Sequence, residues 1–176
     1  MLRTSQLVSG ASRLRLALAL AGAAMVGLAS GGAGATTTTS SFSVTMTLTA
    51  SCTIVSTATL SFGSQGVLTA NVDVTSTLQV QCTNTTPYNI GLDKGANGTS
   101  VTARLLKGGP SNETIQYSIY RDSARTLNWG NTVGTDTTSA TGNGASQSYT
   151  IYGRVPPQTT PTPGTYTDTI TVTVTY

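Results

Sequence analysis

The sequence predicts an all-β protein, an antiparallel β-sandwich or barrel, and three observations support this. Apolar and polar residues alternate through most of the chain after residue 36, as in strands that bury one face. Turn-forming residues, chiefly Gly, Pro, Asn and Asp, separate the alternating segments. The chain is rich in Thr and Val, whose branched Cβ favours strands, and no segment of residues 36–176 has a convincing 3.6-residue period.

Seven segments show the alternation and are the expected strands. In residues 72–82 the apolar side chains share one parity and only Ser76 interrupts them. In the fourth segment Val101, Ala103 and Leu105 share a parity. The expected strands are residues 42–48, 72–82, 88–92, 101–105, 115–119, 149–155 and 166–176. Such a series of short strands is typical of a sandwich or barrel.

Two features have both a plain and a more specific interpretation. Residues 131–146 are polar, Gly-rich and nearly free of apolar side chains, which favours a long exposed loop over a contact surface. Trp129 is the only tryptophan, and a role in the core or a turn is favoured over stacking on a sugar.

Residues 1–35 are expected to be a cleaved signal peptide. Arg3, Arg13 and Arg15 supply the positive charge, an almost wholly apolar segment follows, and residues 33–35 (Ala-Gly-Ala) match the cleavage pattern. A membrane anchor is disfavoured because only about 14 residues separate Arg15 from Ser30, against roughly 20 for a spanning helix.

Removal of this segment changes the charge of the chain. The full sequence has nine basic and six acidic residues, and loss of the three arginines leaves six of each. The remaining cations are scattered, which excludes a nucleic-acid-binding surface: Lys94, Arg104, Lys107, Arg121, Arg125 and Arg154. About 141 residues remain, enough for one domain with a single core.

The two cysteines, Cys52 and Cys82, are expected to form a disulfide. An export signal implies an oxidising compartment, where an even number of cysteines predicts pairing. A zinc site is disfavoured because the chain has no histidine, and the spacing differs from that of a redox C-x-x-C motif.

The sequence gives no sign of catalysis, so we expect no enzyme, no cofactor and no metal. The absence of histidine removes the commonest general base. The carboxylates do not pair in sequence, and neither a G-x-S-x-G motif nor a phosphate-binding glycine loop is present.

Nine short motifs follow one another along residues 42–176, and their order behind an export signal is more specific than any one of them. They are Phe42-x-Val44; Ala50-Ser51-Cys52-Thr53-Ile54; Leu60-Ser61-Phe62-Gly63; Val80-Gln81-Cys82; Pro87-Tyr88-x-Ile90-x-Leu92-Asp93-x-Gly95; Ile115-x-Tyr117-x-Ile119-Tyr120-x-Asp122; Trp129-Gly130; Ile151-Tyr152-Gly153-Arg154-Val155-Pro156; and Pro163-Gly164-x-Tyr166-x-Asp168-x-Ile170-x-Val172-x-Val174-x-Tyr176. With these motifs the chain resembles the spore coat protein U domain, the family that includes Csu-type pilins of the archaic chaperone–usher pathway.

The resemblance implies an incomplete immunoglobulin-like β-sandwich that lacks its last strand. A periplasmic chaperone would lend a strand to the resulting groove, and at an outer-membrane usher the N-terminal extension of the next subunit would replace it. The implied partners are therefore identical or related pilin subunits, the chaperone and the usher. The implied location is an extracellular fimbrium reached through the periplasm, with a role in adhesion or biofilm formation.

Residues 36–48 are the expected donor-strand extension, and residues 49–176 the expected domain. All apolar side chains of the extension share one face: Phe42, Val44, Met46 and Leu48. Their burial at roughly 1.5–3 kcal/mol each would yield about 6–12 kcal/mol before the cost of ordering the segment. The resemblance also implies that the chaperone contacts the final strand, through Ile170, Val172, Val174 and Tyr176.

Three alternatives remain open. Residues 42–48 are also compatible with an ordinary first strand of the chain's own sheet. The family name derives from a self-contained secreted spore- or surface-coat protein, which would not form linear fibres. A tip adhesin is disfavoured because it needs a receptor domain in addition to the pilin domain, and about 141 residues hold only one.

Overall fold

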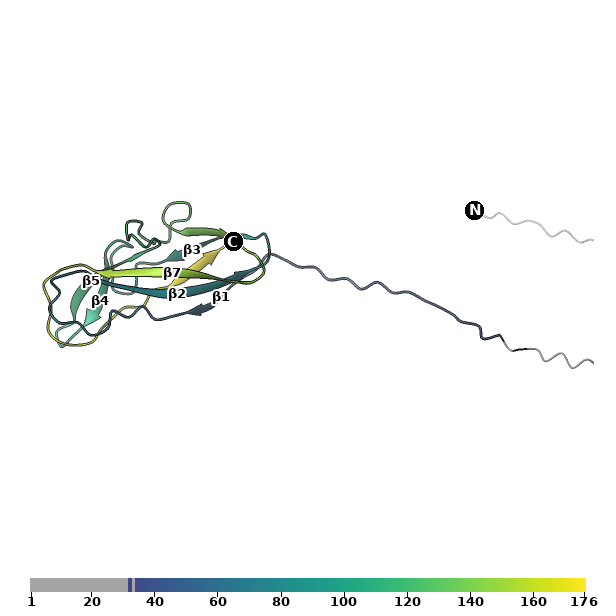
Figure 1. Cartoon of the computed structure of the whole chain (residues 1–176), viewed down its shortest axis with the longest axis horizontal. Coiled ribbons are helices and arrows are strands. Elements are labelled where there is room, and N and C mark those ends of the chain that lie inside the picture. The colour runs from purple at the N-terminus through teal and green to yellow at the C-terminus, as the bar shows by residue number, and fades with distance from the viewer. Residues whose placement is uncertain (1–31, 33) are drawn as a thin grey trace, which may run out of the picture. The chain divides into compact units, whose positions relative to one another are not determined.

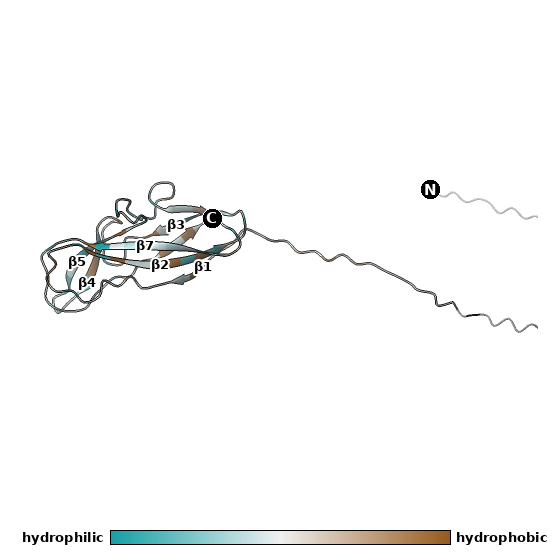
Figure 2. Cartoon of the chain, in the orientation of Figure 1, coloured by the Kyte–Doolittle hydropathy of each residue, from teal (hydrophilic) through white to brown (hydrophobic). Residues whose placement is uncertain are grey.

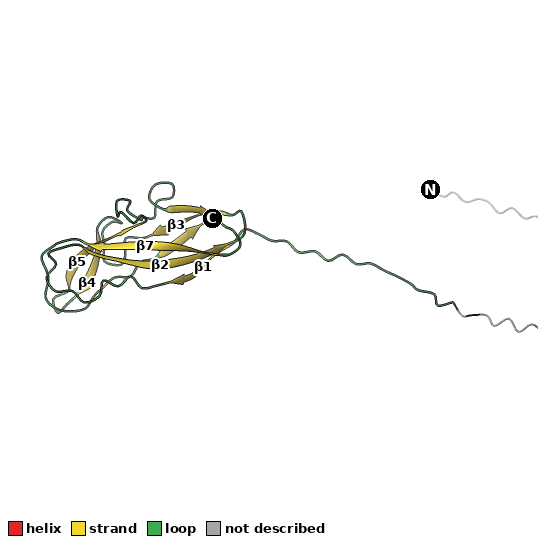
Figure 3. Ribbon diagram, viewed as in Figure 1, coloured by secondary structure: helices red, strands yellow, loops and turns green. Residues whose placement is uncertain are grey.

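The computed structural model describes residue 32 and residues 34–176, so the expected signal peptide lies almost entirely outside the described residues. The chain divides into a unit that ends at Val44 and a compact unit, Thr45–Tyr176. Within the described part, residues 34–51 form no strand, and the elements of the compact unit are strands and loops only (Figures 1 and 3). No helix in this part of the chain is long and apolar enough to cross a membrane.

Nine strands of the compact unit form two antiparallel sheets. The strands are β1 (Cys52–Thr57), β2 (Val72–Cys82), β3 (Pro87–Leu92), β4 (Arg104–Gly108), β5 (Glu113–Tyr120), β6 (Thr138–Thr141), β7 (Ser146–Val155), β8 (Tyr166–Thr167) and β9 (Val172–Thr175). One sheet has the order β1-β2-β7-β5-β4-β8 and the other the order β6-β3-β9. The predicted all-β antiparallel fold is confirmed, and the arrangement is a sandwich.

The longest ladder follows directly from the alternation in the sequence. β2 pairs with β7 without interruption from Val72↔Val155 to Gln81↔Ser146. Leu78 and Val80 are fully buried on the inner face of β2, while their polar neighbours face outward. The buried apolar residues of the strands form one core cluster. Figure 2 shows the apolar residues as short stretches along the strands.

Trp129 belongs to this core, as predicted. Its side chain is 1% exposed, and Nε1 donates a hydrogen bond of 2.9 Å to the carbonyl oxygen of Ile90. The bond satisfies the indole N–H, which would otherwise be costly to bury.

The predicted parity of the fourth strand is wrong. β4 begins at Arg104, while Val101 and Ala103 lie in the preceding turn and bridge. The fully buried residue of β4 is Arg104, whose guanidinium donates five hydrogen bonds of 2.6–3.0 Å to the backbone carbonyls of Leu92, Asp93, Val101 and Trp129. A pattern based on hydropathy cannot identify such a position, because carbonyl acceptors from distant segments make the burial of the cation possible.

Two other segment predictions need correction. Residues 131–146 are not one exposed loop, because β6 lies within them and pairs with β3 from Pro87↔Thr141 to Ile90↔Thr138. Residues 166–176 are not one strand: β8 pairs with β4 in the larger sheet, whereas β9 pairs with β3 in the smaller sheet. The chain crosses between the sheets at residues 168–171.

Candidate assembly site

The candidate site lies where the two sheets end side by side. β1 is the edge strand of the six-stranded sheet, β9 is the edge strand of the three-stranded sheet, and the two strands contact each other. Neither strand has a second partner strand among the described residues. Each therefore has one backbone edge available for pairing, which is the arrangement that strand addition requires.

The β9 side of the site has an apolar inner face. Val172 and Val174 are half-buried and pack against the core, whereas Thr173 and Thr175 point outward and are exposed. Ile170, which precedes the strand, also packs against the core. The structure thus places three of the four predicted residues of the final strand on the core side, and leaves Tyr176 60% exposed.

On the β1 side, two apolar side chains of the strand are unusually exposed for a sandwich. Ile54 is 41% exposed and Val55 48% exposed, although Ile54 pairs with the fully buried Val80. The register with β2 shifts between Ile54 and Ser56, which marks a β-bulge at Val55. Sequence reasoning missed the exposed pair Ile54 and Val55, for which the only signal was two adjacent apolar residues between polar ones.

The chain leaves this edge after β1 and fills part of the interior. The backbone N–H of Ala58 donates to Thr77, and the hydroxyl of Ser76 donates to the carbonyl of Ala58 at 2.7 Å. Leu60 and Phe62 then pack against the core beside Gly153, where an added Cβ would lie 2.8 Å from a Leu60 methyl carbon. Beyond the end of β1, the segment with Ala58, Leu60 and Phe62 therefore fills the space beside the core, and the open part of the site is limited to the length of β1.

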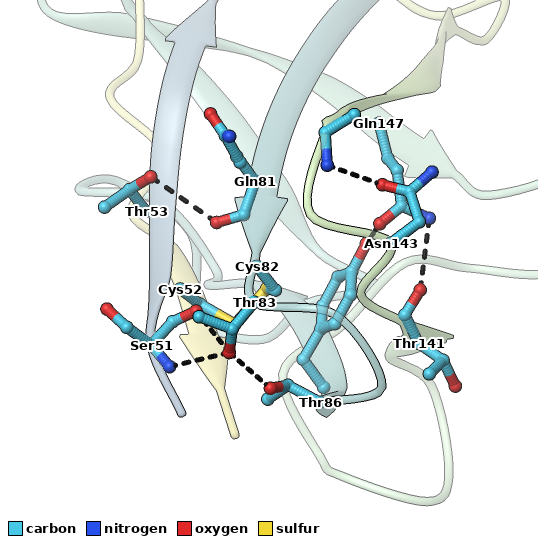
Figure 4. The surroundings of a disulfide bond; sticks show 12 residues. Ser51, Cys52, Thr53, Gln81, Cys82, Thr83, Thr86, Thr141, Asn143 and Gln147 are labelled. Atoms are coloured by element: carbon cyan, nitrogen blue, oxygen red, sulfur yellow. Dashed lines mark hydrogen bonds between the residues drawn. A yellow bond between two sulfur atoms is a disulfide. The ribbon is translucent and has the colours of Figure 1, made fainter. Parts of the chain in front are cut away.

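The predicted disulfide between Cys52 and Cys82 is present and ties β1 to β2. The two residues face each other in the ladder, with Cα atoms 4.1 Å apart. Around it, the backbone N–H of Ser51 donates to the hydroxyl oxygen of Thr83, which also shares a 2.6 Å hydrogen bond with Thr86 (Figure 4). The start of β1 is thus covalently held, while the outer edge of the strand remains unpaired.

Two carboxylates anchor the crossing from β8 to β9. Asp93 Oδ1 accepts hydrogen bonds of 2.9 Å from the backbone N–H groups of Gly95 and Thr171. Burial raises the pKa of Asp93, but these N–H donors outweigh burial, and the pKa lies below its usual value. The carboxylate therefore remains charged at neutral pH and fixes the residue that precedes β9.

Asp168 joins the same crossing to the other sheet. Its Oδ2 accepts a 2.6 Å hydrogen bond from the hydroxyl of Tyr117 on β5, and its Oδ1 accepts hydrogen bonds from the backbone and side-chain N–H groups of Asn97. Burial, followed by the hydrogen bond to Asp168, raises the pKa of Tyr117. The phenol is therefore a permanent donor, and sequence reasoning did not foresee this anchor because its members lie far apart along the chain.

The predicted donor residues lie outside the sheets. Their side chains are 80–88% exposed, and residues 42–48 form no strand: Phe42, Val44, Met46 and Leu48. Four large apolar side chains on one parity and fully in solvent are costly for a soluble protein.

A hollow of about 820 Å³ lies at the end of the compact unit where β1 begins. It is lined by residues 48–51 before β1, by Thr53 of β1, by Gln81 and Cys82 at the end of β2, by the segment 83–87, by Gly144 and by Tyr176. None of the residues that line it carries a charged side chain. Tyr176 and the start of β1 therefore lie at the same end of the compact unit.

The described residues offer no arrangement suited to metal chemistry. No group of three or more Asp, Glu, Cys or His side chains comes together among them. The carboxylates of Asp93 and Asp168 are occupied by backbone and tyrosine donors, as described above. The geometry of the site instead suits the addition of a strand.

Comparison with known proteins places the chain in a family. The model of the spore coat protein U domain matches residues 38–173. Protein U of Myxococcus xanthus is 33% identical over 140 residues, which cover 72% of this chain and 78% of that protein.

Among solved structures, one match is a chain of the CsuC–CsuE chaperone–tip adhesion subunit pre-assembly complex from the archaic chaperone–usher Csu pili of Acinetobacter baumannii. The TM-score is 0.53 and the identity 23%, over 74% of this chain and 41% of that chain. This chain thus spans less than half of the solved chain, and the likeness shows a common fold, consistent with an immunoglobulin-like sandwich. From its motifs and its match to the family model, the chain belongs to the spore coat protein U domain family.

Proposed function

We propose that the chain is a structural subunit of an extracellular chaperone–usher pilus, polymerised by strand exchange and serving in adhesion or biofilm formation. Residues 36–48 of one subunit add a strand between β1 and β9 of its neighbour. The observation that carries the proposal is the pair of unpartnered edges at β1 and β9, together with an apolar segment, residues 42–48, whose large side chains are 80–88% exposed. Membership of the family and the fold shared with a chain of a Csu chaperone–subunit complex support it.

The dimensions of donor and acceptor agree. The donor has four apolar side chains on one parity over residues 42–48, and the acceptor has four over residues 170–176. An antiparallel addition to β9 places Leu48 opposite Ile170 and Val44 opposite Val174. Every strand pair in the compact unit is antiparallel. The added strand would continue this pattern at β9 and would run parallel to β1.

In this direction a donor strand cannot enter its own subunit. Leu48 would lie near Ile170, whereas Cys52 lies at the opposite end, beside the hollow that Tyr176 lines. Residues 42–48 span roughly 20 Å at about 3.3 Å per residue. The four Cα–Cα steps from Leu48 to Cys52 reach at most about 14 Å. The donor strand must therefore come from another copy.

Exchange in this direction builds a fibre when each copy donates to the next. Each subunit receives a strand whose C-terminal end lies near Ile170 and sends out its own extension from the opposite end. Such a heterologous, head-to-tail contact can repeat from copy to copy. Before secretion the same edges require a temporary strand, which is the role of the periplasmic chaperone, and the outer-membrane usher is the site of exchange.

A self-contained coat protein is the second candidate, and one observation favours it. The three-residue spacer 49–51 also permits a hairpin in which residues 42–48 pair with β1 of the same chain. In that hairpin Met46 lies opposite Ile54. The apolar face of residues 42–48 then also points inward. The secreted chain would then fold alone and form no fibre.

Paired cysteines distinguish these two functions. The mature chain is expressed in the periplasm with its chaperone and usher as the double variant Val44→Cys, Val174→Cys. Strand exchange predicts a ladder of covalent multimers. The control pair Thr45→Cys, Val174→Cys places the first cysteine on the opposite face and should give at least tenfold less cross-linking.

The hairpin predicts a different result. Met46→Cys with Ile54→Cys would then form an intramolecular bond in a monomer, and the Val44–Val174 pair would not form multimers. As an independent test, Val44→Asp with Met46→Asp should abolish polymerisation but leave the chaperone-bound subunit intact. Normal fibres from this variant would refute the assignment of residues 42–48 as the donor.

A further inference from the structure

The three-stranded sheet has a second free edge besides β9. In the order β6-β3-β9, β6 is the other edge strand, and no second strand pairs with it in the part of the chain that the structure describes. Its inner face is half-buried, and Ala140 packs against the core. A strand with one apolar face can in principle add to either edge of a sheet. The function proposed above therefore requires that β9 be selected over β6.

Strand parity identifies the backbone groups on the free edge of β6. Directly after β6, the N–H and the carbonyl of Gly142 both form hydrogen bonds with the segment before β3, at Thr86 and Thr85. Backbone groups point to alternate sides along a strand, so every second residue back from Gly142 also faces β3. The residues that face the free edge are the others: Thr137, Ser139 and Thr141.

Two side chains occupy carbonyl oxygens on this free edge. The guanidinium of Arg121, which follows β5, donates a hydrogen bond of 2.6 Å from Nη1 to the carbonyl of Thr137. The side-chain amide of Gln147 on β7 donates a hydrogen bond of 3.2 Å to the carbonyl of Thr141. We call these two side chains, Arg121 and Gln147, the β6 cap. They flank Ser139, the middle residue of the edge, on both sides.

The edges of the candidate assembly site have no such cap. Among the described residues, no side chain donates a hydrogen bond to a backbone carbonyl within β1 or within β9. Around β1 these bonds end just outside the strand, at Ser51 before it and at Ala58 after it. The carbonyls that an added strand would use are therefore free at the assembly site and occupied at β6.

The charge of Arg121 strengthens the cap. Its Nε is buried without a hydrogen-bond partner, and the ion pairs of the described residues do not include its guanidinium. A strand that added to β6 would have to displace this cation from the Thr137 carbonyl, and charge-assisted hydrogen bonds are roughly twice as strong as neutral ones. Charged side chains on an edge strand are one of the means by which proteins prevent strand addition.

We propose that the β6 cap directs the donated strand to β9 by keeping the other edge of the same sheet closed. The inference rests on the proposed function, because it concerns the edge that the donated strand enters. It assigns the choice of edge to Arg121 and Gln147, which belong to neither the donor segment nor the acceptor strands.

Cross-linking at the two edges tests this role. The donor carries Val44→Cys, and the acceptor carries either Val174→Cys on β9 or Ala140→Cys on the inner face of β6, in the full chain expressed with its chaperone and usher. With the cap intact, covalent multimers should form through position 174 and only at background level through position 140. With Arg121→Ala and Gln147→Ala, the cross-link through position 140 should rise about tenfold or more, as expected for the loss of a charge-assisted hydrogen bond.

Two variants serve as controls. Arg125→Ala with Gln81→Ala removes the same two types of side chain, whose carbonyl acceptors lie outside β6. This variant should leave both cross-links unchanged. Arg121→Lys keeps a charged donor at the edge and should leave the cross-link through position 140 low.

A proline on the free edge provides an independent block. Ser139→Pro removes the N–H group that faces this edge, and edge strands tolerate proline where the N–H faces solvent. Added to Arg121→Ala and Gln147→Ala, it should return the cross-link through position 140 to background and leave the cross-link through position 174 in place. A cap that served only the stability of the fold would not be replaced by proline.

The outcomes separate this inference from the proposed function. If the cross-link through position 140 stays at background without the cap while multimers form through position 174, the cap does not select the edge and strand exchange stands. The same conclusion follows if loss of the cap abolishes both cross-links, or if Ser139→Pro leaves the cross-link through position 140 high. If multimers through position 174 do not form even with the cap intact, the proposed function fails and the inference fails with it.

Discussion

Replacement of Arg104 by Met should destabilise the domain strongly, although it removes a charge from the core. The guanidinium is fully buried and is bonded only to backbone carbonyls. Methionine occupies a similar length without offering any donor, so the carbonyl oxygens of Leu92 and Trp129 lose a buried partner. Each unsatisfied buried acceptor costs about 1–3 kcal/mol, which gives about 2–6 kcal/mol for the pair.

Part of this loss is regained because the variant no longer has to bury a cation. We therefore expect the free energy of unfolding to fall by about 2–3 kcal/mol, toward the lower end of that range. Arg104→Lys should give an intermediate loss, because one ammonium cannot reach all four carbonyls. Lys107→Met, an exposed cation on the same strand, is the matched control and should stay within about 0.5 kcal/mol.

The assay is urea unfolding of the mature chain with residues 36–48 relinked behind Tyr176, where the proposed function expects them to pair with the β1 and β9 edges. Trp129 is the only tryptophan and its carbonyl contacts Arg104, so its fluorescence reports on this part of the core. A loss below about 1 kcal/mol for Arg104→Met would refute the argument that the carbonyls depend on this donor. If Arg104→Met lost no more unfolding free energy than Lys107→Met, the argument would also be refuted.

Three further predictions concern the walls of the site. Gly153→Ala should lower the free energy of unfolding by about 1–3 kcal/mol in the same assay, because its Cβ would lie 2.8 Å from Leu60; unchanged stability would show that Leu60 moves aside. Cys52→Ser should lower stability by about 3–4 kcal/mol and the periplasmic yield with it, since the bridge closes a loop with a sequence separation of 30; an unchanged melting temperature would contradict this. The folded-state pKa of Asp93 is below its ordinary value of 3.8, so its contribution to the free energy of unfolding is full above pH 3.8 and is lost as the pH falls through the lower folded pKa. Asp93→Asn should therefore reduce the loss of stability at acid pH, measured in the same assay. An unchanged loss would show that other carboxylates cause it.

Local patterns in the sequence were sufficient to predict the long strands and their buried faces. In β2, β3, β5 and β7 one parity is apolar and the other polar, and the structure buries the apolar parity in each. The alternation is decisive there because one face of each strand packs on the core, so that a shift by one residue would expose the whole apolar set. The disulfide was equally predictable, since export and an even cysteine count sufficed.

The prediction failed where a segment depends on distant partners. β6 contains a single apolar residue, Ala140, and exists because β3 offers it a free edge. The break between β8 and β9 is invisible in the continuous alternation of residues 166–176, because Asp168 looks like an ordinary polar strand position. Its carboxylate instead joins Tyr117 to Asn97, which lie in different parts of the chain. No local pattern records such a contact.

The candidate site was predictable in its apolar residues but not in its geometry. The pattern of residues 42–48 identifies which side chains are available for burial, but a strand added to β9 and a hairpin on β1 would bury the same face. Side-chain parity therefore cannot choose between a fibre and a self-contained domain. Chain direction and reach separate the two: a strand parallel to β1 requires roughly 20 Å between Leu48 and Cys52, against about 14 Å that the spacer supplies, so it has to come from another copy. A hairpin antiparallel to β1 needs only the three-residue spacer 49–51, which the chain has. The direction in which residues 42–48 run beside β1 therefore decides between the proposed fibre and a self-contained domain.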